Sequence, residues 1–412
     1  MSAGFVTTHY GWIMDEQKWQ AMWKMFVKPT ETITNKKYCN KEGGYYFMSS
    51  PKVSIVIPVY NVENFLEQCM DSAIQQTLED IEIICIDDGS TDKSGEILDA
   101  YARQDTRVRV IHKENGGYGV AMNTGLDLAC GEYFSILESD DFFMPDTCEI
   151  LYKNAKKFDA DIVRSDYFDY ITKYGKVNLT AKQMSKDYSY YYRLICPNKE
   201  PEVYTFVMHN WTGIYKISFL RDKNIRYNET PGASYQDNGF YFQVFSQTER
   251  LVYIPRPFYC YRIDNPGSSI NNPDKVYTMA DEYAFIRAFL AKHPEFEQTL
   301  LPVYYARLFR AYHQTYMRIA PEFRKEFRQF FHDQFVETKQ MHLLDTGLCS
   351  VNQRKLLCAL LKSPEEYHKL IFGNKLFTAR NINRALEVIE VHGWKAFFGK
   401  CRKVLGRRRG HE

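Results

Sequence analysis

The sequence predicts an α/β fold built on a parallel sheet, and three stretches carry this prediction. They are V-S-I-V-I-P-V-Y-N (Val53 to Asn61), I-E-I-I-C-I-D-D-G-S-T-D (Ile81 to Asp92) and G-E-Y-F-S-I-L-E-S-D-D (Gly131 to Asp141). Each is a short apolar run that ends in polar residues, as expected for strands that are covered on both faces. The polar residues should therefore gather at the carboxyl ends of the strands, where open α/β sheets bind ligands.

The size and composition of the chain narrow its class. Its 412 residues exceed what one hydrophobic core usually supports, so two units are expected. A formal net charge of +2 gives no general case for a nucleic-acid partner. The ten cysteines form no C-x-x-C pair or zinc cluster, which favours unpaired thiols in a reducing cytoplasm. No run of 18 apolar residues and no signal-peptide pattern is present, which also predicts a cytoplasmic protein.

The first fifty residues are the least informative. An amphipathic helix could run from Asp15 to Val27, and Gly43-Gly44 interrupts the polar segment that follows. Met48 lies directly before the first core strand, so residues 1–50 are either a translated leader or a docking arm.

From Val53 onward, strands and helices alternate as in βαβ units. Strands are expected at 53–59, 81–86, 107–111, 132–137 and from 161; helices are expected at 62–76, 93–103, up to 128 and from 145. Ser90, Thr91 and Asp92 are capping candidates for the second helix.

Beyond Asp166 the alternation loosens. Residues 167–204 are rich in tyrosine and phenylalanine and are expected to form an irregular insertion near the ligand cleft. Segment 209–220 should be a strand or loop and 235–245 a helix, both returning to the sheet, and 252–262 should be a strand. A boundary is expected near Asn272. Helices should then cover 277–292, 302–319, 321–337, 352–361, 364–371 and 382–406.

The acidic clusters at the strand ends are candidates for chemistry. Like charges at close range raise each other's pKa, and a divalent cation relieves this. Glu138, Asp140 and Asp141 offer the hard oxygen ligands that Mg²⁺ or Mn²⁺ prefers. Asp87 or Asp88 could accept a hydrogen bond from a nucleobase N–H, with Tyr60 stacking on the base. Taken singly, each cluster could equally be a polar turn.

The order of these motifs resembles that of the family 2 glycosyltransferases. The matching segments are Pro58 to Asn61, Gln76-Thr77, Glu82 to Asp92, Asn115 to Gly117, Gly131 to Tyr133 and Glu138 to Asp141. The resemblance is dense over about 115 residues and thins by Phe168. It implies the GT-A fold, an αβα sandwich that binds a nucleotide sugar, and an acidic D-x-D motif.

The resemblance also implies roles for individual residues. Pro58 and Tyr60 would line the base and ribose, Asp88 would read a uracil-like N–H, and Asp140 would bind the metal that bridges the diphosphate. Glu138 departs from the usual first aspartate and would reach ribose or metal. The expected substrate-binding residues are Pro58, Val59, Tyr60, Asn61, Glu63, Asp88, Asn115, Gly117, Glu138, Ser139, His209, Trp211, Arg262 and Ser268, and the expected metal ligands are Asp140 and Glu138.

An inverting transfer also needs a general base for the acceptor hydroxyl. By the resemblance, this carboxylate stands at the start of a helix, where the sequence has Gln236-Asp237-Asn238, so Asp237 is the expected base. Asp237 could instead serve as a helix cap, or serve both roles.

Two further segments fit a closing cleft. At the acceptor side, Trp211, with His209, could stack on a sugar. Arg262 and Ser268 stand in a segment that resembles the family's Y-R…S pattern, and by this resemblance Arg262 would neutralise the leaving diphosphate. A packed core histidine or a structural Arg262 salt bridge explains the same residues equally well.

The C-terminal tail, Val391 to Arg409, mixes aromatic and basic residues. Such a helix can lie on an anionic membrane surface, which would place the enzyme at the inner face of the membrane, but basic termini are also often simply solvated. The preceding helices could pack on the catalytic domain, bind acceptor or form a homo-oligomer.

The resulting prediction is a metal-dependent, inverting glycosyltransferase using Mn²⁺ or Mg²⁺. It would move a hexosyl or N-acetylhexosaminyl group from a UDP-sugar to a hydroxyl of a surface glycan or lipid-linked glycan. The expected domains are an extension (1–50), a GT-A domain (51–272, with nucleotide-sugar half 51–166 and acceptor half 167–272) and a helical region (273–412).

There are three rival interpretations of the sequence. A nucleotidyltransferase would need a Gly-rich basic loop after its first strand, and a dehydrogenase would need G-x-G-x-x-G there; neither is present. A non-catalytic nucleotide-sugar-binding partner in a glycan assembly complex stays open, because Glu138 departs from the motif.

Overall fold

A computed structural model describes residues 6–8, 11–15, 50–233, 235–267 and 272–373. The chain forms two compact units, Met1–Leu308 and Phe309–Glu412, and each is considered by itself. The expected GT-A domain, 51–272, lies wholly in the first unit, which also contains the next helix. The helix expected for Asp15–Val27 lies outside the described residues apart from Asp15.

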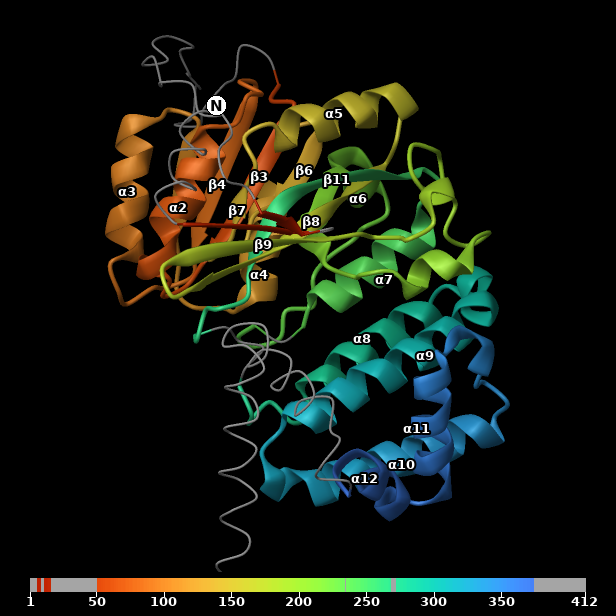
Figure 1. Cartoon of the computed structure of the whole chain (residues 1–412). Coiled ribbons are helices and arrows are strands. Elements are labelled where there is room, and N and C mark those ends of the chain that lie inside the picture. Colours follow the sequence, from red (N-terminus) through yellow and green to blue (C-terminus); the bar gives the residue numbers. More distant parts are fainter. Residues whose placement is uncertain (1–5, 9–10, 16–49, 234, 268–271, 374–412) are drawn as a thin grey trace, which may run out of the picture. The chain divides into compact units, whose positions relative to one another are not determined.

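Four parallel strands form the centre of the first unit (Figure 1). They are β3 (Val53–Val59), β4 (Ile81–Asp87), β5 (Val108–His112) and β6 (Tyr133–Ile136), in the order β6-β3-β4-β5. All side chains of β3, β4 and β6 are buried, which explains their continuous apolar runs. The parallel sheet predicted from the alternation of strands and helices is confirmed here.

Helices cover both faces of this sheet. They are α2 (Glu63–Ile74), α3 (Ser94–Gln104), α4 (Tyr118–Leu128) and α5 (Thr147–Phe158). The backbone of Gly125 on α4 packs directly against Val56 of β3, while Met70 on α2 contacts Cys85 of β4. Val56 pairs with Ile84, the neighbour of Cys85, so the two contacts lie on opposite faces of the sheet. The expected αβα sandwich is thereby confirmed.

An antiparallel part extends the sheet beyond β6. Strand β10 (Gly213–Lys216) lies between β6 and β8 (Ile162–Lys173), antiparallel to both. Strand β9 (Lys176–Lys182) pairs with β8, and β2 (Gly11–Asp15) and β1 (Val6–Thr8) follow. A strand of the first fifty residues is thus part of the sheet.

The expectation of an irregular insertion over 167–204 is wrong for its first part. Residues 162–182 form the β8–β9 hairpin, whose two-residue turn is Tyr174-Gly175, both with positive φ (54° and 68°). Positive φ at both positions is the type I′ geometry that suits the twist of two strands. The rest of the segment is irregular, with short 3₁₀ turns η1 (Tyr188–Tyr190) and η2 (Pro201–Thr205).

Strand β11 (Leu251–Arg262) completes the sheet, pairing with β8 in parallel and with β7 (Phe142–Phe143) antiparallel. Between β10 and β11 lie α6 (Ile217–Asp222) and α7 (Asp237–Gln247), and the 3₁₀ turn η3 (Asn210–Thr212) precedes β10. The expected strand at 252–262 and helix at 235–245 are confirmed.

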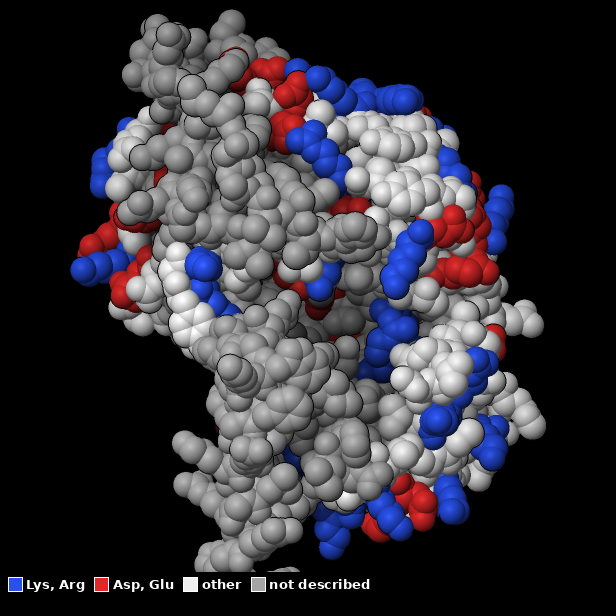
Figure 2. All heavy atoms as spheres, viewed as in Figure 1, with Lys and Arg blue, Asp and Glu red and all other residues white. Residues whose placement is uncertain are grey.

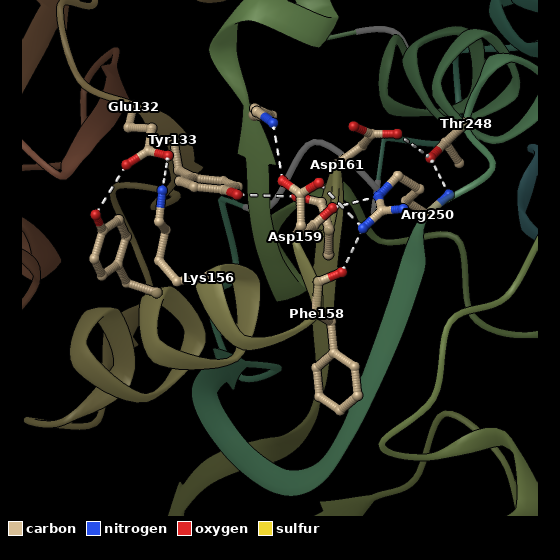
Figure 3. A network of polar contacts seen from close by, with 11 residues as sticks. Glu132, Tyr133, Lys156, Phe158, Asp159, Asp161, Thr248 and Arg250 are labelled. Atoms are coloured by element: carbon tan, nitrogen blue, oxygen red, sulfur yellow. Dashed lines mark hydrogen bonds and ion pairs between the residues drawn. The ribbon is translucent and has the colours of Figure 1, made fainter.

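A polar network fixes the amino-terminal edge of the sheet (Figure 3). The Arg250 guanidinium donates to the carbonyls of Phe158 (2.7 Å) and Asp159, at the end of α5. Thr248 Oγ1 donates to Asp161 at the start of β8 (3.1 Å), and Tyr133 Oη donates to the Ala160 carbonyl (2.9 Å). These bonds join α5, β6, β8 and β11 at the edge opposite the carboxyl ends of the parallel strands.

The remaining described residues are helical. They form α8 (Thr278–Ala291), α9 (Pro294–Arg318), η5 (Pro321–Phe323), α10 (Arg324–Gln340), η6 (Thr346–Leu348), α11 (Val351–Lys362) and α12 (Pro364–Phe372). Helix α9 begins eight residues before the expected Pro302, because Pro294 suits the first helical turn and Pro302 is tolerated inside. In the second unit, Phe327, Phe331 and Phe335 of α10 are fully buried together with Tyr367 of α12.

The basic tail and the helix expected at 382–406 lie outside the described residues. Every helix of the described part of the chain is too short or too polar to cross a bilayer. On the face shown in Figure 2, lysines and arginines are interspersed with aspartates and glutamates over the residues that are not drawn in grey.

Candidate active site

The loops after β3 and β4 are bound to each other. The strands pair up to their last residues, Val59 with Asp87. Asn61, with φ of 52°, accepts a hydrogen bond from the Thr91 N–H (2.7 Å) and donates its own N–H to Ser90 Oγ (3.1 Å). Glu63 accepts from the Lys93 N–H (2.9 Å). The side chains of Asn61 and Glu63, expected to bind substrate, therefore hold the two loops together in the structure.

Tyr60 is the exposed member of the first loop. Its side chain is 50% exposed, whereas Pro58 and Val59 are buried within β3. A nucleobase could therefore contact the ring of Tyr60, but only the backbone of Pro58 and Val59.

Asp88 is 4% exposed, and its carboxylate organises the loop before α4. One oxygen accepts from Lys113 Nζ (2.6 Å) and the Gly116 N–H (2.9 Å), and the other accepts from the Gly117 N–H (2.8 Å). A carboxylate has about four acceptor positions. One position remains on the oxygen that faces Gly117, so a base N–H would have to bind there.

Gly117 and Asn115 of the loop before α4 differ in their exposure to solvent. Gly117 has φ of 89° and caps α4 with its N–H bonded to Asp88. Asn115 is exposed. Ser268, the other residue expected near the phosphates, lies outside the described residues.

Asp87 and Asp88, the two acids at the end of β4, differ in role. Asp87 accepts from the Ser90 N–H (2.9 Å) and contacts His112 Nδ1 (2.7 Å), within the scaffold. This contact raises the pKa of His112. Asp88 lies next to it at the loop described above. Of the two alternatives for binding a nucleobase, Asp88 is therefore the better placed, because both oxygens of Asp87 are used locally.

The acids of the E-S-D-D segment also differ in role: one binds the scaffold and two remain for a ligand. Asp141 is 1% exposed and accepts from Tyr259 Oη (2.7 Å) and the Arg262 N–H (2.7 Å), so it anchors the segment to β11. Burial and the neighbouring Asp140 raise its pKa. Ser139 is 7% exposed. Glu138 and Asp140 are half-buried and are the acids of this segment that remain for a ligand.

Glu138 is held by a tyrosine. Its carboxylate accepts a hydrogen bond from Tyr118 Oη (2.7 Å), at the start of α4. Burial raises the pKa of Glu138 to about 8; the Tyr118 bond opposes this rise, and the charges of Asp140 and Asp237 add to it. The Tyr118 N–H also donates to the Gly232 carbonyl (3.1 Å), which accepts from Gln236 Nε2 (3.0 Å) as well, so the segment that leads to Asp237 contacts the residue that holds Glu138.

Asp237 stands in the first turn of α7. Asn238 Nδ2 donates to its Oδ1 (3.1 Å). Burial raises the pKa of Asp237 to about 7, although the bonds with Asn238 oppose the shift. A carboxylate with a pKa near neutrality can take up a proton in the working pH range.

The aromatic residues of the acceptor side form a stack. The Trp211 ring lies 4.5 Å from His209 and 4.1 Å from Tyr259, both nearly parallel to it, and Tyr261 stacks at 5.2 Å. Trp211 is only 6% exposed, so its faces are used in this packing. Burial lowers the pKa of His209 to about 3, so this imidazole is neutral.

Arg262 is 8% exposed and packs between two aromatic rings. Its guanidinium lies 4.8 Å from the Phe65 ring centre and 4.7 Å from that of Tyr170. Its Nε donates to the Asp140 carbonyl (2.8 Å), and another nitrogen donates to Gln68 Oε1. This arrangement fixes the backbone of Asp140 and matches the structural alternative for Arg262 more closely than direct contact with a diphosphate.

Sequence reasoning missed a buried polar group that links the two halves of the site. Asn210, 1% exposed, donates to Tyr118 Oη (3.2 Å) and to Tyr227 Oη (3.0 Å), and its carbonyl accepts from Tyr215 Oη (2.6 Å). Asn210 lies inside the H-N-W-T segment, between the larger side chains of His209 and Trp211. Tyr118 follows Gly117 directly, and its place at the start of a helix beside the acidic motif was the available signal.

The two half-buried acids fit a divalent cation that takes few protein ligands. Within the described ranges, no cluster of three or more His, Cys, Asp or Glu is arranged around a metal position. Asp140 Oδ2 accepts from Asn265 Nδ2 (2.7 Å), and its other oxygen has no hydrogen bond from the described residues. Mg²⁺ is typically bound by one or two carboxylates together with substrate phosphates and water, which is the set available here.

Comparison with known sequences agrees with this geometry. Residues 54–219 match the sequence model of glycosyl transferase family 2. The chain is 34% identical over 234 residues to the uncharacterized glycosyltransferase EpsJ of Bacillus subtilis, covering 55% of this chain and 64% of that protein. It is 47% identical over 122 residues to glycosyltransferase GlyG of Streptococcus pneumoniae, covering 29% and 40%. The matches thus span less than two thirds of each relative's length.

Comparison with solved structures agrees with the fold. The crystal structure of S. aureus TarS 1-349 in complex with UDP-GlcNAc superposes with a TM-score of 0.58 at 17% identity, covering 77% of this chain and 89% of that one. The fold is a GT-A fold. Within this fold, residues 54–219 are similar to glycosyl transferase family 2, in agreement with the order of the sequence motifs.

Proposed function

We propose that the protein is an inverting glycosyltransferase that moves a hexosyl or N-acetylhexosaminyl group from a UDP-sugar to a hydroxyl of a glycan acceptor. The observation that carries this proposal is the contact of Tyr118 with both parts of the candidate site: its hydroxyl donates to Glu138 (2.7 Å), and its N–H donates to the Gly232 carbonyl (3.1 Å) in the segment that leads to Asp237. The resemblance of the fold to a UDP-GlcNAc complex supports the choice of UDP.

In this proposal, the donor lies along the ends of β3, β4 and β6. Tyr60 stacks on the base, and the remaining acceptor position of Asp88 takes a base N–H. The loop bonds of Asn61 keep these two groups at a fixed separation. Such preorganisation lowers the cost of ordering the site when the nucleotide binds.

Glu138 and Asp140 would hold Mn²⁺ or Mg²⁺, which when bound neutralises the charge that develops on the leaving diphosphate. The Tyr118 bond orients the Glu138 carboxylate and favours its ionised form, and Arg262 fixes the backbone of Asp140. In this proposal, Arg262 acts on the diphosphate through Asp140 rather than by direct contact.

Asp237 would remove the proton from the acceptor hydroxyl while that oxygen attacks the anomeric carbon. The new bond forms on the face opposite the leaving diphosphate, so the configuration inverts. A base of this kind contributes about 10²- to 10⁴-fold to the rate. The half-buried His209 and Tyr261 rings are the parts of the aromatic stack that an acceptor sugar could contact.

The test is a panel of nucleotide sugars with Mn²⁺ or Mg²⁺, in which release of nucleoside diphosphate is followed for the wild type, Asp140→Ala and Asp237→Asn. The exposed Asp222→Asn is the matched control. Metal-dependent release from one donor, lost in both site variants and kept in the control, is the expected result. An α-linked donor should give a β-linked product by NMR.

Binding of UDP with no release from any donor, even with glycan acceptors from the source organism, would contradict the proposal. That outcome would favour the non-catalytic nucleotide-sugar-binding partner. Contact of the tail, Val391 to Arg409, with the inner face of a membrane also stays a prediction, and the tail lies outside the described residues.

A further inference from the structure

A buried glutamate on α8 contacts the helix that carries the proposed base. Glu282 is 1% exposed and lies beyond the segment that matches the family model, which ends at residue 219. Its Oε1 accepts a hydrogen bond from the Gly239 N–H (2.7 Å), and its Oε2 accepts from Asn228 Nδ2 (2.9 Å). One carboxylate thus joins two points of the chain, one before Asp237 and one after it.

The first of these contacts completes the start of α7. The first N–H groups of a helix have no partner within the helix. Here the Asn238 N–H donates to the Tyr235 carbonyl and the Phe240 N–H donates to the Gln236 carbonyl, whereas the Gly239 N–H donates to Glu282. The carboxylate therefore satisfies a helix N–H that lies two residues from Asp237.

Close packing leaves little freedom around this contact. A Cβ at Gly239 would overlap Glu282 Oε1 and lie 2.8 Å from the Phe285 ring. On the other side of the segment, a Cβ at Gly119 of α4 would overlap the Asn228 carbonyl. Asn123 of α4 also binds the segment, through the Tyr227 N–H (2.9 Å) and carbonyl (3.0 Å). The segment from Asn228 to Gly239 is thus held between α4 and α8.

We propose that Glu282 is a positioning residue for the general base: by binding both Asn228 and Gly239, it fixes the segment that presents Asp237 to the acceptor. No hydrogen bond joins Glu282 to Asp237 among the described residues, although burial and the charge of Asp237 raise the pKa of Glu282. The two hydrogen bonds of Glu282 hold the backbone of α7 and the Asn228 side chain, and this is how it would position Asp237. This inference rests on the proposed function. It assigns a catalytic purpose to α8, which the family-matched segment does not include.

The reason to expect an effect on rate is geometric. A reacting group must be held within a fraction of an ångström of its productive position, and a displacement of about 1 Å can cost 10²-fold in rate. Loss of the carboxylate would release the Gly239 N–H and the Asn228 amide together. Tyr60 and Asp88 lie on the loops after β3 and β4, outside this segment. The segment does contact Tyr118, whose N–H donates to the Gly232 carbonyl (3.1 Å), but Asp88 itself binds the Gly116 and Gly117 N–H groups, so nucleotide affinity should change little.

The test compares Glu282→Ala, Glu282→Gln and Asn228→Ala with Asp281→Asn, which changes the exposed neighbour of Glu282 on α8. Glu282→Ala should lower kcat about 100-fold, with KM for the donor and Kd for UDP within twofold of wild type. Glu282→Gln should recover kcat to within about fivefold, because its amide oxygen can accept from Gly239 and a turned Asn228 amide can accept from its NH₂. Asn228→Ala, which removes one of the two bonds, should lie between, and Asp281→Asn should match wild type.

Hydrogen exchange provides a readout that does not depend on turnover. The Gly239 amide should exchange at least tenfold faster in Glu282→Ala than in wild type, and at the wild-type rate in Asp281→Asn. Should Glu282→Ala fail to fold, Asn228→Ala and Glu282→Gln decide by the same two readouts.

Three outcomes would overturn the inference. They are a kcat of Glu282→Ala within twofold of wild type, a loss of UDP affinity that parallels the loss of kcat, and a Glu282→Gln variant as impaired as Glu282→Ala. If the wild type itself transfers no sugar, the proposed function fails instead. In that case unchanged exchange at Gly239 in Glu282→Ala would also refute the positioning role.

Discussion

At the scale of single residues, two effects oppose each other at Asp237. The positive end of a helix dipole favours an anion in the first turn by about 0.3–1 kcal/mol. Burial acts in the other direction and prevails, since the pKa of Asp237 is raised to about 7. The carboxylate therefore exchanges its proton near neutral pH, which suits a general base that must be regenerated in every cycle.

This shift predicts the acid limb of the pH profile. The base works only when ionised. At saturating Mn²⁺, which favours ionised Glu138, kcat/KM should therefore fall about tenfold per pH unit below about pH 7 and level off above it. Initial rates at low donor concentration between pH 5.5 and 8.5 measure this. In Asp237→Asn the residual rate should lack the limb. If the fall in kcat/KM at low pH persists unchanged in Asp237→Asn, a titrating group other than Asp237 causes it.

The Tyr118–Glu138 bond predicts a change in metal affinity. Tyr118→Phe removes the donor that opposes the rise in the pKa of Glu138, so less of this carboxylate is ionised at pH 7. The Mn²⁺ concentration for half-maximal activity should rise about tenfold, equivalent to about 1.4 kcal/mol for a hydrogen bond to a charged group. Tyr152→Phe, which breaks a similar bond to Glu132 outside the site (2.8 Å), should leave it unchanged. An equal shift in both variants would contradict a local role for Tyr118.

The sequence could reveal which residue types line the site but not how each side chain is used. Tyr60 and Asp140 lie where the pattern of strand ends predicts. Asn61 and Arg262 carry chemistry equally suited to ligands and to scaffold, and only the structure shows their oxygens and nitrogens engaged with the protein. Glu282 follows the family motifs by more than a hundred residues, so its contact with Gly239 depends on tertiary packing that no local pattern encodes.

At the scale of elements, the contact of α4 with β3 depends on a missing side chain. A Cβ at Gly125 would overlap the Val56 side chain. Gly125→Ala gains about 0.5–1 kcal/mol of helix propensity but overpacks the core at a cost of about 1–3 kcal/mol. Overpacking should prevail, so the free energy of unfolding in urea should fall by about 0.5–2 kcal/mol. Thr124→Ala, at the next position, should change it by less than about 0.5 kcal/mol. A stabilised Gly125→Ala would refute the close approach.

The network in Figure 3 predicts a change in stability without a change in ligand binding. Arg250→Met removes the guanidinium that caps the carbonyls at the end of α5, which should lower the free energy of unfolding by about 1–2 kcal/mol. UDP affinity should stay at the wild-type value, because the network lies at the other edge of the sheet. Lys153→Met, which breaks an exposed helix pair with Glu149, should cost less than about 0.5 kcal/mol. Weaker UDP binding in Arg250→Met would show that the two edges are coupled.

The elements also show where sequence patterns suffice. Strands buried on both faces produce continuous apolar runs, so β3, β4 and β6 could be placed almost to the residue. The β8–β9 hairpin could not, because its type I′ turn is Tyr174-Gly175 rather than the usual Asn-Gly or Asp-Gly. The antiparallel position of β10 between β6 and β8 depends on pairing across the sheet, which a single strand of four residues does not specify.

At the scale of the whole molecule, buried carboxylates of the first unit should give stability an unusual pH dependence. Burial raises the pKa of Glu138 to about 8, and those of Asp237 and Glu282 to about 7. In the unfolded chain these groups titrate near 4.5 or below. Between these values the native state binds more protons than the unfolded state, so stability falls as pH rises.

Histidines act in the opposite direction only at lower pH. The pKa of His209 is lowered to about 3 by burial, so it favours the native state increasingly as pH rises towards 6.5, and its contribution is then complete. His112, whose pKa is raised by Asp87, loses stabilisation as pH rises, as the carboxylates do. Above about pH 6.5, the carboxylates and His112 therefore all make the protein less stable as pH rises, and His209 no longer contributes to the change.

We expect the Tm of the metal-free protein to fall by several degrees between pH 6.5 and 8.5, measured by calorimetry at constant ionic strength. Glu282→Gln should reduce this fall, because it removes one of the three carboxylates. UDP with Mn²⁺ should reduce it further, since a cation bound by ionised Glu138 and Asp140 favours the deprotonated native state. A Tm that is constant or rises over this range would mean that the buried acids are ionised without cost. The chain would then need another source of compensating charge near the site.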